Sequence, residues 1–166
     1  MPGRRRPGTP SRMHIRRAVA DDVTAVRAVV EAAYVHYVPR IGREPAPMTA
    51  DYETLVAAGD VWIGERDGRV VGVLVIRASG DALELENVAV DPAEQGLGHG
   101  RSLVSFAEGH ARALGLAAVE LYTNEAMVDN IDLYPRLGFV ETGRRVEDGY
   151  RRVYFRKTLD ARELRR

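Results

Sequence analysis

LELENVAVDPAEQGLGHGRSLVSFAEGHARAL, residues 83–114, is the stretch that decides the predicted fold. Residues 83–90 are mostly apolar and predict a largely buried strand. Asp91-Pro92 ends this strand, because proline cannot donate a ladder hydrogen bond and restricts the residue before it. From Arg101 the apolar residues recur at roughly helical spacing. The stretch therefore predicts a strand, a glycine-rich turn and a helix in succession.

The turn carries Gly96, Gly98 and Gly100 at every second position. Glycine permits positive φ and lets another molecule approach the backbone closely. The N-terminus of the following helix favours an anion such as phosphate, because its N–H groups are unpaired and its dipole is positive there. The turn lacks the Gly-Lys-Ser/Thr of a P-loop, and Arg101 stands where a dinucleotide fingerprint needs its third glycine. A glycine-rich turn without a ligand is the alternative.

Composition narrows the class of protein. The 166 residues predict one domain with an ample apolar core. Net charge is zero, from 24 basic and 24 acidic residues, which argues against specific nucleic-acid binding. No apolar run approaches a membrane span and no signal peptide is visible, so we expect a cytoplasmic protein with no membrane partner. Cysteine is absent, which excludes disulfides and a cysteine acyl-enzyme, and no grouping of ligand residues predicts a metal.

The predicted elements alternate between strand and helix in a mixed order. Residues 1–13 are rich in proline, glycine and arginine and predict a disordered basic tail, residues 14–160 form the domain, and 161–166 are a C-terminal tail. The order is β-α-α-β-β-β-α-β-α-β-β, an α+β pattern. Strands are expected at 14–18, 61–65, 70–76, 83–90, 118–123, 140–144 and 152–157, and helices at 23–37, 49–58, 101–114 and 126–137. Pro39 is expected to end the first helix, residues 40–47 to form a loop and Thr49 to cap the second helix. Asp67-Gly68 and Glu147-Asp148-Gly149 are expected to form hairpin turns.

Two motifs and this element order resemble those of the GCN5-related N-acetyltransferases, the GNAT family. Gln95-x-x-Gly98-x-Gly100 is similar to the family's Q/R-x-x-G-x-G/A pyrophosphate loop. Residues 130–139, NIDLYPRLGF, resemble the later part of the family's N-x-x-A-x-x-L-Y-x-x-x-G-F. In this chain Met127 occupies the usual Asn position and Asn130 the usual Ala position. The resemblance runs from residue 15 to 158 and implies a mixed, mostly antiparallel sheet flanked by helices.

The resemblance also implies the activity and the co-substrate. It implies an acetyl-CoA-dependent enzyme that moves the acetyl group directly to a primary amine, without a metal. The pyrophosphate is expected on the backbone N–H groups of the glycine-rich turn. The end of the preceding strand is expected to splay from its neighbour and pair with the pantetheine amides. The implied cofactor-binding residues are Val88, Ala89, Val90, Gln95, Gly96, Leu97, Gly98, His99, Gly100, Arg101 and Asn130.

Acid–base chemistry has three candidate residues. Tyr134 matches the family's general-acid tyrosine, and packing beside Phe139 is the alternative. Glu84 and Glu86 lie two apart on a strand, so we expect them to share a face as candidates for the base. Substrate binding or pairing with an arginine is the alternative for both. Asn87 is expected on the opposite face, and a β-bulge at this point is the alternative that would change its side.

The acceptor pocket is expected near the first helix, where the family builds it. Its candidate residues are Tyr34, Tyr37, Arg40, Met48 and Tyr52. His36 is a further candidate base, against the alternative of an exposed histidine at a helix end. The side chains of His99 and His110 are expected at the surface. The acceptor is an amine of unknown identity and the assembly a monomer or homodimer; a non-catalytic acyl-CoA-binding module and a nucleic-acid-associated protein are the other two functions considered.

Overall fold

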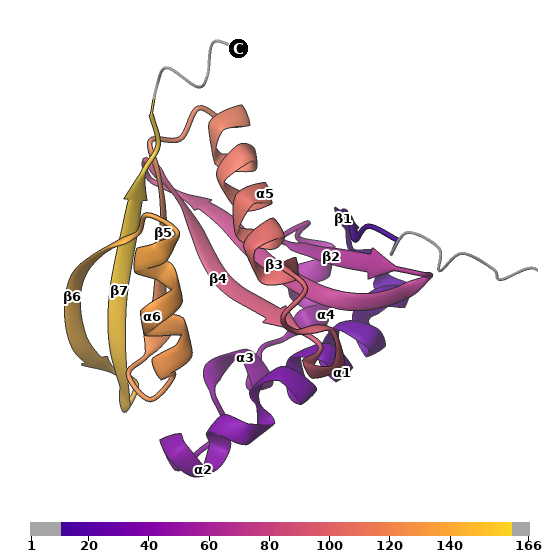
Figure 1. Cartoon of the computed structure of the whole chain (residues 1–166), viewed down its shortest axis with the longest axis horizontal. Coiled ribbons are helices and arrows are strands. Elements are labelled where there is room, and N and C mark those ends of the chain that lie inside the picture. The colour runs from indigo at the N-terminus through magenta and orange to yellow at the C-terminus, as the bar shows by residue number, and fades with distance from the viewer. Residues whose placement is uncertain (1–10, 161–166) are drawn as a thin grey trace, which may run out of the picture.

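The computed structural model describes residues 11–160, in which a seven-stranded sheet carries helices on both faces (Figure 1). The strands lie in the order β1-β2-β3-β4-β5-β7-β6. Only β4 and β5 pair in parallel among these neighbours, so the predicted mixed and mostly antiparallel sheet is confirmed. The strands are β1 (His14–Arg17), β2 (Val61–Arg66), β3 (Arg69–Ser79), β4 (Ala82–Val90), β5 (Ala118–Asn124), β6 (Val140–Glu147) and β7 (Tyr150–Thr158).

Six α-helices and three short 3-10 turns complete the described part of the chain. The helices are α1 (Val23–Tyr34), α2 (Val38–Ile41), α3 (Ala46–Thr49), α4 (Tyr52–Ala57), α5 (His99–Ala113) and α6 (Val128–Arg136). The 3-10 turns are η1 (Ala20–Asp22), η2 (Val35–Tyr37) and η3 (Pro92–Glu94). The helices α1, α5 and α6 come within a few residues of their predicted ranges.

Two predictions about the segment between α1 and β2 were wrong. Pro39 does not end the helical stretch, because it occupies the first turn of α2, where its missing N–H is not needed. Residues 40–47 are therefore not all loop. Thr49 does not cap the next helix either: the Asp51 carboxylate accepts the N–H of Thr54 and begins α4.

The two faces of the sheet carry separate apolar cores. Strand side chains alternate between faces, so Val73 and Val75 of β3 pack toward α1, α3 and α4, whereas Leu74 and Ile76 pack toward α5 and α6. Asp67-Gly68 and Asp148-Gly149 turn the β2–β3 and β6–β7 hairpins with positive φ at both residues, the conformation of type I′ turns.

The sheet opens between β4 and β5. These strands pair only at three positions, from Ala82 opposite Ala118 to Glu84 opposite Glu120. Beyond them β4 continues for six residues and β5 for four without pairing to each other. Figure 1 shows the two strands close at one end and far apart at the other, with α6 over the β5 side. The expected splay of the end of β4 is therefore present.

Two ion-paired clusters tie helices to the sheet. Arg16 of β1 donates two hydrogen bonds, at 2.8 and 2.9 Å, to the buried carboxylate of Asp22, which also accepts the N–H of Val19. On the opposite face Lys157 of β7 lies 2.5 Å from Oε1 of Glu108 on α5. The Lys157–Glu108 pair joins a strand and a helix that lie far apart in the sequence, whereas Arg16 and Asp22 are only six residues apart.

The first described residues lie against strand β2. Residues 1–10 and 161–166 lie outside the described residues, whereas Ser11 and Met13 contact β2, at Arg66 and Gly64 respectively. Within residues 11–160 no helix is both long and apolar enough to cross a membrane. In the same range no three His, Cys, Asp or Glu side chains gather as metal ligands would.

Candidate functional site

A cavity of about 200 Å3 fills the opening between β4 and β5. Residues 85–88 of β4 form one wall, and residues 122–124 of β5 with Tyr150 and Arg152 of β7 form the other. Helices α1, α4 and α6 contribute Tyr34, Tyr52, Asn130 and Tyr134. The lining thus combines apolar and aromatic surface with a few polar groups, as in most small-molecule sites.

A β-bulge decides which side chains of β4 face the α1 side. Val75 of β3 stands opposite Asn87 and Ile76 opposite Leu85, so Glu86 is an extra residue in β4. The bulge changes the alternation, so that Asn87 lies on the same face as Val75 and Glu84. The expectation that Asn87 faces away from the glutamates was therefore wrong.

Asn87 is held by two tyrosines at the floor of the cavity. The Tyr34 hydroxyl is 2.7 Å from Oδ1 of Asn87 and 3.0 Å from the carbonyl oxygen of Val88. Nδ2 of Asn87 donates to the hydroxyl of Tyr52, which donates to the Pro47 carbonyl. These bonds leave the buried amide well satisfied and fix its orientation. Burial raises the pKa of both tyrosines, so they stay protonated donors.

The two candidate bases differ in their access to the cavity. Glu86 lines the cavity and accepts a hydrogen bond from the Arg77 guanidinium, the arginine pairing that was its alternative. Glu84 lies opposite Arg77 and Glu120, where β4 and β5 are still paired, and does not line the cavity. Only Glu86 is thus placed to meet a molecule in the opening.

Tyr134 is both packed and presented to the cavity. Its ring centroid lies 5.5 Å from that of Phe139 and 5.7 Å from that of Phe155, and the residue lines the cavity. Burial raises the pKa of its phenol to about 12. No hydrogen bond joins its hydroxyl to another residue in the range 11–160. At neutral pH the phenol is therefore protonated, and its hydroxyl can donate a hydrogen bond to a molecule in the cavity.

The glycine-rich turn has the geometry of an anion cradle. Gly96 and Gly98 have φ of 81° and 84°, and Gly98 is the N-cap of α5. A Cβ built on Gly96 or Gly98 would meet no atom within 4 Å, and one on Gly100 only Cγ2 of Val90 at 3.9 Å. The open space and the unpaired N–H groups fit a pyrophosphate. The exposed Leu97 and Arg101 lie in the same turn, and Nε2 of Gln95 donates to the carbonyl of Val90, joining the turn to the end of β4.

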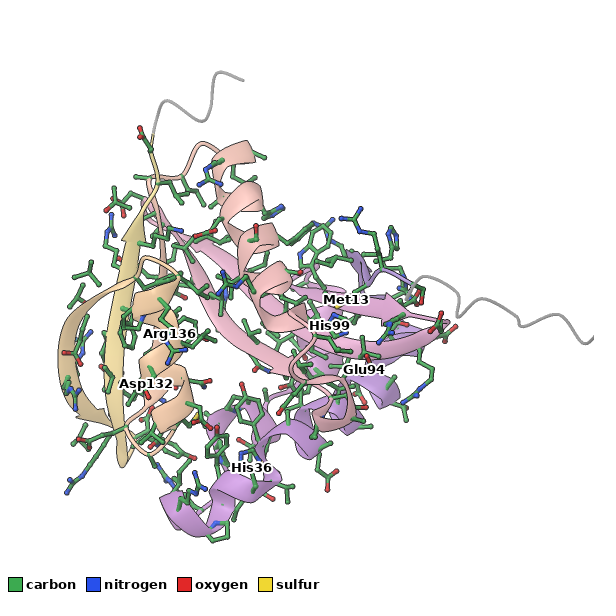
Figure 2. All side chains as sticks on the ribbon, in the orientation of Figure 1. Met13, His36, Glu94, His99, Asp132 and Arg136 are labelled. Carbon is green, nitrogen blue, oxygen red and sulfur yellow. The ribbon has the colours of Figure 1, made fainter. Side chains whose placement is uncertain are left out.

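His99 differs from the prediction in one respect. Its backbone belongs to the cradle, but its side chain is buried instead of exposed, with Nε2 3.1 Å from Oε2 of Glu94. Figure 2 shows the two residues side by side at the start of α5. Arg66 of β2 donates to the same carboxylate oxygen, and this pairing compensates the charge of Glu94 and lowers its pKa. His110 is half-buried against Trp62 and Phe106, not on the surface.

The predicted acceptor residues divide into two groups. Tyr34 and Tyr52 line the cavity, whereas Tyr37, Arg40 and Met48 do not. His36 is exposed at η2, and Figure 2 shows it on the helical segment after α1. Asn130 lines the cavity, and its Nδ2 lies 3.4 Å from Oγ1 of Thr123 and 3.6 Å from the sulfur of Met127.

Sequence reasoning missed the contribution of the C-terminal hairpin. Tyr122, Tyr150 and Arg152 line the cavity opposite Glu86. The alternation of Arg152 with buried Val153 and Phe155 in β7 marks a two-faced strand, but nothing local shows that its outer face meets the first helices. The Tyr150 hydroxyl donates to the Glu44 carbonyl at 2.7 Å, which makes that long-range contact.

The sequence matches known proteins over most of its length. The family model described as the acetyltransferase (GNAT) family matches residues 26–139. A curated relative, the mycothiol acetyltransferase of Thermomonospora curvata, is 41% identical over 80 residues, which cover 48% of this chain and 27% of that protein. The chain thus aligns with about a quarter of that relative's length.

Solved structures match nearly the whole described fold. The PaiA N-acetyltransferase of Thermoplasma acidophilum, in complex with coenzyme A, has a TM-score of 0.74 at 15% identity, covering 89% of this chain and 99% of that one. A Salmonella typhimurium protein solved with its cofactor acetyl-CoA has a TM-score of 0.69 at 26% identity, covering 90% and 95%. These likenesses confirm the predicted α+β fold.

Proposed function

Because the chain belongs to the GNAT acetyltransferase family, we propose that it transfers the acetyl group of acetyl-CoA directly to a primary amine. The observation that carries this proposal is the joint presence of Glu86 and Tyr134 in the cavity where β4 and β5 part. One carboxylate and one neutral phenol are the two groups that amine acylation by a thioester needs.

Acetyl-CoA, as the co-substrate, supplies the thioester, and this chain's residues fit its parts. We assign the pyrophosphate to the N–H groups of residues 95–101, whose glycines leave open space at the start of α5. We assign the pantetheine amides to residues 88–90 of β4, which have no neighbouring strand on the β5 side. Asn130 stands on the opposite side of the cavity as a further polar contact.

Glu86 and Tyr134 divide the proton transfers between them. An ammonium has no lone pair, so Glu86 accepts a proton from the acceptor, directly or through a water, before nitrogen attacks the thioester carbon. A backbone N–H near Val88 stabilises the negative charge that develops on the thioester oxygen. As the carbon–sulfur bond breaks, Tyr134 donates its proton to the departing sulfur. The attacking nitrogen passes its second proton through water to the Tyr134 phenolate, and Glu86 releases its proton to solvent, so the products are an amide, a free thiol and one proton.

A non-catalytic acyl-CoA-binding module is the less favoured alternative. Binding alone would not require a carboxylate and a protonated phenol to line the same cavity, as Glu86 and Tyr134 do. The identity of the amine, the monomeric or dimeric assembly and the cytoplasmic location stay predictions.

The proposal is tested by incubating the protein with acetyl-CoA and a panel of free amines and peptides. We expect amine-dependent release of thiol and an acetylated acceptor by mass spectrometry. Tight CoA binding by calorimetry without thiol release across a broad panel would favour the non-catalytic alternative.

A further inference from the structure

Resting on the proposed acetyl transfer, we propose that the acceptor carries a carboxylate beside its amine, and that Arg152 binds that carboxylate. The substrate class is then an amino acid or a similar zwitterionic amine, not a simple alkylamine. Arg40 is the one cationic side chain among the acceptor residues predicted from sequence, and it does not line the cavity, whereas Arg152, which was not among them, does.

The side chain of Arg152 is mostly buried in the cavity wall and is held there by aromatic rings. Its side chain is only 10% exposed, and its guanidinium lies 4.2 Å from the ring centroid of Tyr122 and 5.7 Å from that of Tyr150. Aromatic faces stabilise a guanidinium and hold its plane in one orientation. A charged group that is mostly removed from water and fixed by two rings is pre-organised to bind an anion.

The guanidinium retains capacity for a second carboxylate. It has five N–H donors, of which Nη1 donates to Oε2 of Glu147 at 3.0 Å, while the Asp148 carboxylate is 4.0 Å away, beyond hydrogen-bond distance. Tyr154 provides one further side-chain hydrogen bond. Glu147 is shared with Arg145, whose Nε is 3.1 Å from its other oxygen. The two carboxylates of the turn therefore do not cancel the local positive charge, to which Arg43 also contributes through its position over Tyr150.

The opposite wall carries the complementary charge. Glu86 lines the cavity from β4, and its partner Arg77 is shared with Asp60, whose carboxylate lies 4.0 Å from it. Asp60 and Arg77 do not line the cavity, so Glu86 is the charged group that this wall presents to it. A cavity with a negative wall at Glu86 and a positive wall at Arg152 matches a molecule that carries an ammonium and a carboxylate. The ammonium then lies beside the proposed base, and the carboxylate fixes its position.

The remaining lining favours an apolar body for this acceptor. Tyr34, Tyr52, Leu55, Val75 and Met127 surround the space between the charged walls. We therefore choose L-phenylalanine and L-leucine as probes, each paired with the amine that lacks only the carboxylate, phenethylamine and 3-methylbutylamine.

The experiment compares these pairs on wild type and on Arg152→Gln, at equal concentrations of free amine. We expect wild type to prefer each amino acid in kcat/KM by about 10-fold or more, since charge-assisted bidentate hydrogen bonds contribute on this scale. Arg152→Gln should lose that preference through a rise of about 10- to 100-fold in KM for the amino acid. Its KM for acetyl-CoA should stay near the wild-type value, and any loss with the simple amines should be much smaller than the loss with the amino acids.

Arg145→Gln is the matched control. Arg145 lies opposite Arg152 in the same hairpin and contacts the same Glu147, but it is 64% exposed and does not line the cavity. Its loss removes equal charge and should leave the preference intact. Arg152→Lys keeps the charge but lacks the planar guanidinium, so it should lose most of the preference. This variant tests the proposal if Arg152→Gln does not fold.

Three outcomes would overturn the proposal. They are equal use of both members of a pair by wild type, an equal loss on both members in Arg152→Gln, and an unchanged preference in the folded Arg152 variant. If no amine is turned over, the proposed acetyl transfer is wrong. Calorimetry with L-phenylalanine on the CoA complex then tests the carboxylate site by itself. Binding of L-phenylalanine that depends on Arg152 would support the carboxylate site, and its absence would overturn it.

Discussion

At the scale of single residues, Tyr134 provides the sharpest test of the acid–base assignment. Its pKa of about 12 keeps the phenol protonated at neutral pH. We expect Tyr134→Phe to lower kcat by about 100-fold while CoA affinity changes little. This decrease is at the lower end of the range for a general acid, because a thiolate is a good leaving group. The ring packing against Phe139 and Phe155 is kept in this variant. A wild-type rate in a chemistry-limited assay would contradict the assignment.

Glu84 and Glu86 offer a matched pair that differs in access to the cavity. We expect Glu86→Gln to lower kcat/KM at neutral pH by about 100-fold and to shift the rate profile toward high pH, where free amine is abundant. Glu84→Gln, outside the cavity lining, should keep the wild-type profile. The check is a pH–rate profile for both variants. If neither changes the acidic limb, the base lies elsewhere.

At the scale of elements, the start of α5 links backbone conformation to co-substrate binding. Gly98 has positive φ at the N-cap, and a valine there is strained and projects into the proposed pyrophosphate site. We expect Gly98→Val to weaken CoA binding by about 100-fold or more in calorimetry. Gly115, just past the other end of α5, also has positive φ, so Gly115→Val controls for the strain alone. Equal loss of affinity in both variants would contradict the cradle.

Asp22 joins β1 to the beginning of α1 and makes stability depend on pH. The Arg16 guanidinium, with the N–H of Val19, holds the pKa of Asp22 below its usual range. A lowered pKa in the folded state contributes stability above the unfolded pKa of about 3.9, and this contribution is lost as pH falls through the folded value.

We therefore expect Asp22→Asn to lower the free energy of unfolding by about 1–3 kcal/mol at pH 7, with the difference from wild type shrinking below about pH 4. The exposed neighbour Asp21 in η1 provides the control variant Asp21→Asn, which should behave as wild type. Denaturant unfolding at several pH values measures both. A deficit that persists unchanged at pH 3 would show that the ion pair is not its source.

At the scale of the whole molecule, the cavity between β4 and β5 predicts the kinetic order. Its lining comes from both halves of the opened sheet, so acceptor and co-substrate meet in one space, and the sequence has no cysteine to carry the acetyl group. We expect intersecting initial-velocity lines, the pattern of a sequential mechanism. Parallel lines, or an acetylated protein formed fast enough to lie on the pathway, would contradict direct transfer.

The sequence predicted what depends on local pattern. The order of the strands, the two hairpin turns and the start of α5, expected at Arg101 and found at His99, follow from periodicity and glycine placement within a few residues. The two short helices α2 and α3 were not predicted. The bulge at Glu86 could not be predicted from local pattern, because it depends on the register in which β3 pairs with β4. The same limit explains His99, whose burial requires Arg66 from a strand more than thirty positions earlier to compensate Glu94.

The acceptor wall shows this limit most clearly. Tyr34 and Tyr52 were predicted from their place near the first helix, whereas Arg152 became visible only when the last hairpin was seen to close against the segment around Glu44. Side chains that meet across more than a hundred residues leave no spacing signal in either segment. The catalytic candidates, by contrast, lie in motifs next to the elements that present them.

Lys157 is the only lysine in the sequence. Its ammonium is paired with Glu108, and its side chain is 27% exposed. The protein therefore offers almost no side-chain amine of its own to reactive thioesters or to labelling reagents. Acetate that appears on lysine in a mixture of this protein with a peptide library can be attributed to the library. An amine-directed dye would in turn place a single side-chain label beside α5, at a known point on the face that carries the proposed co-substrate site.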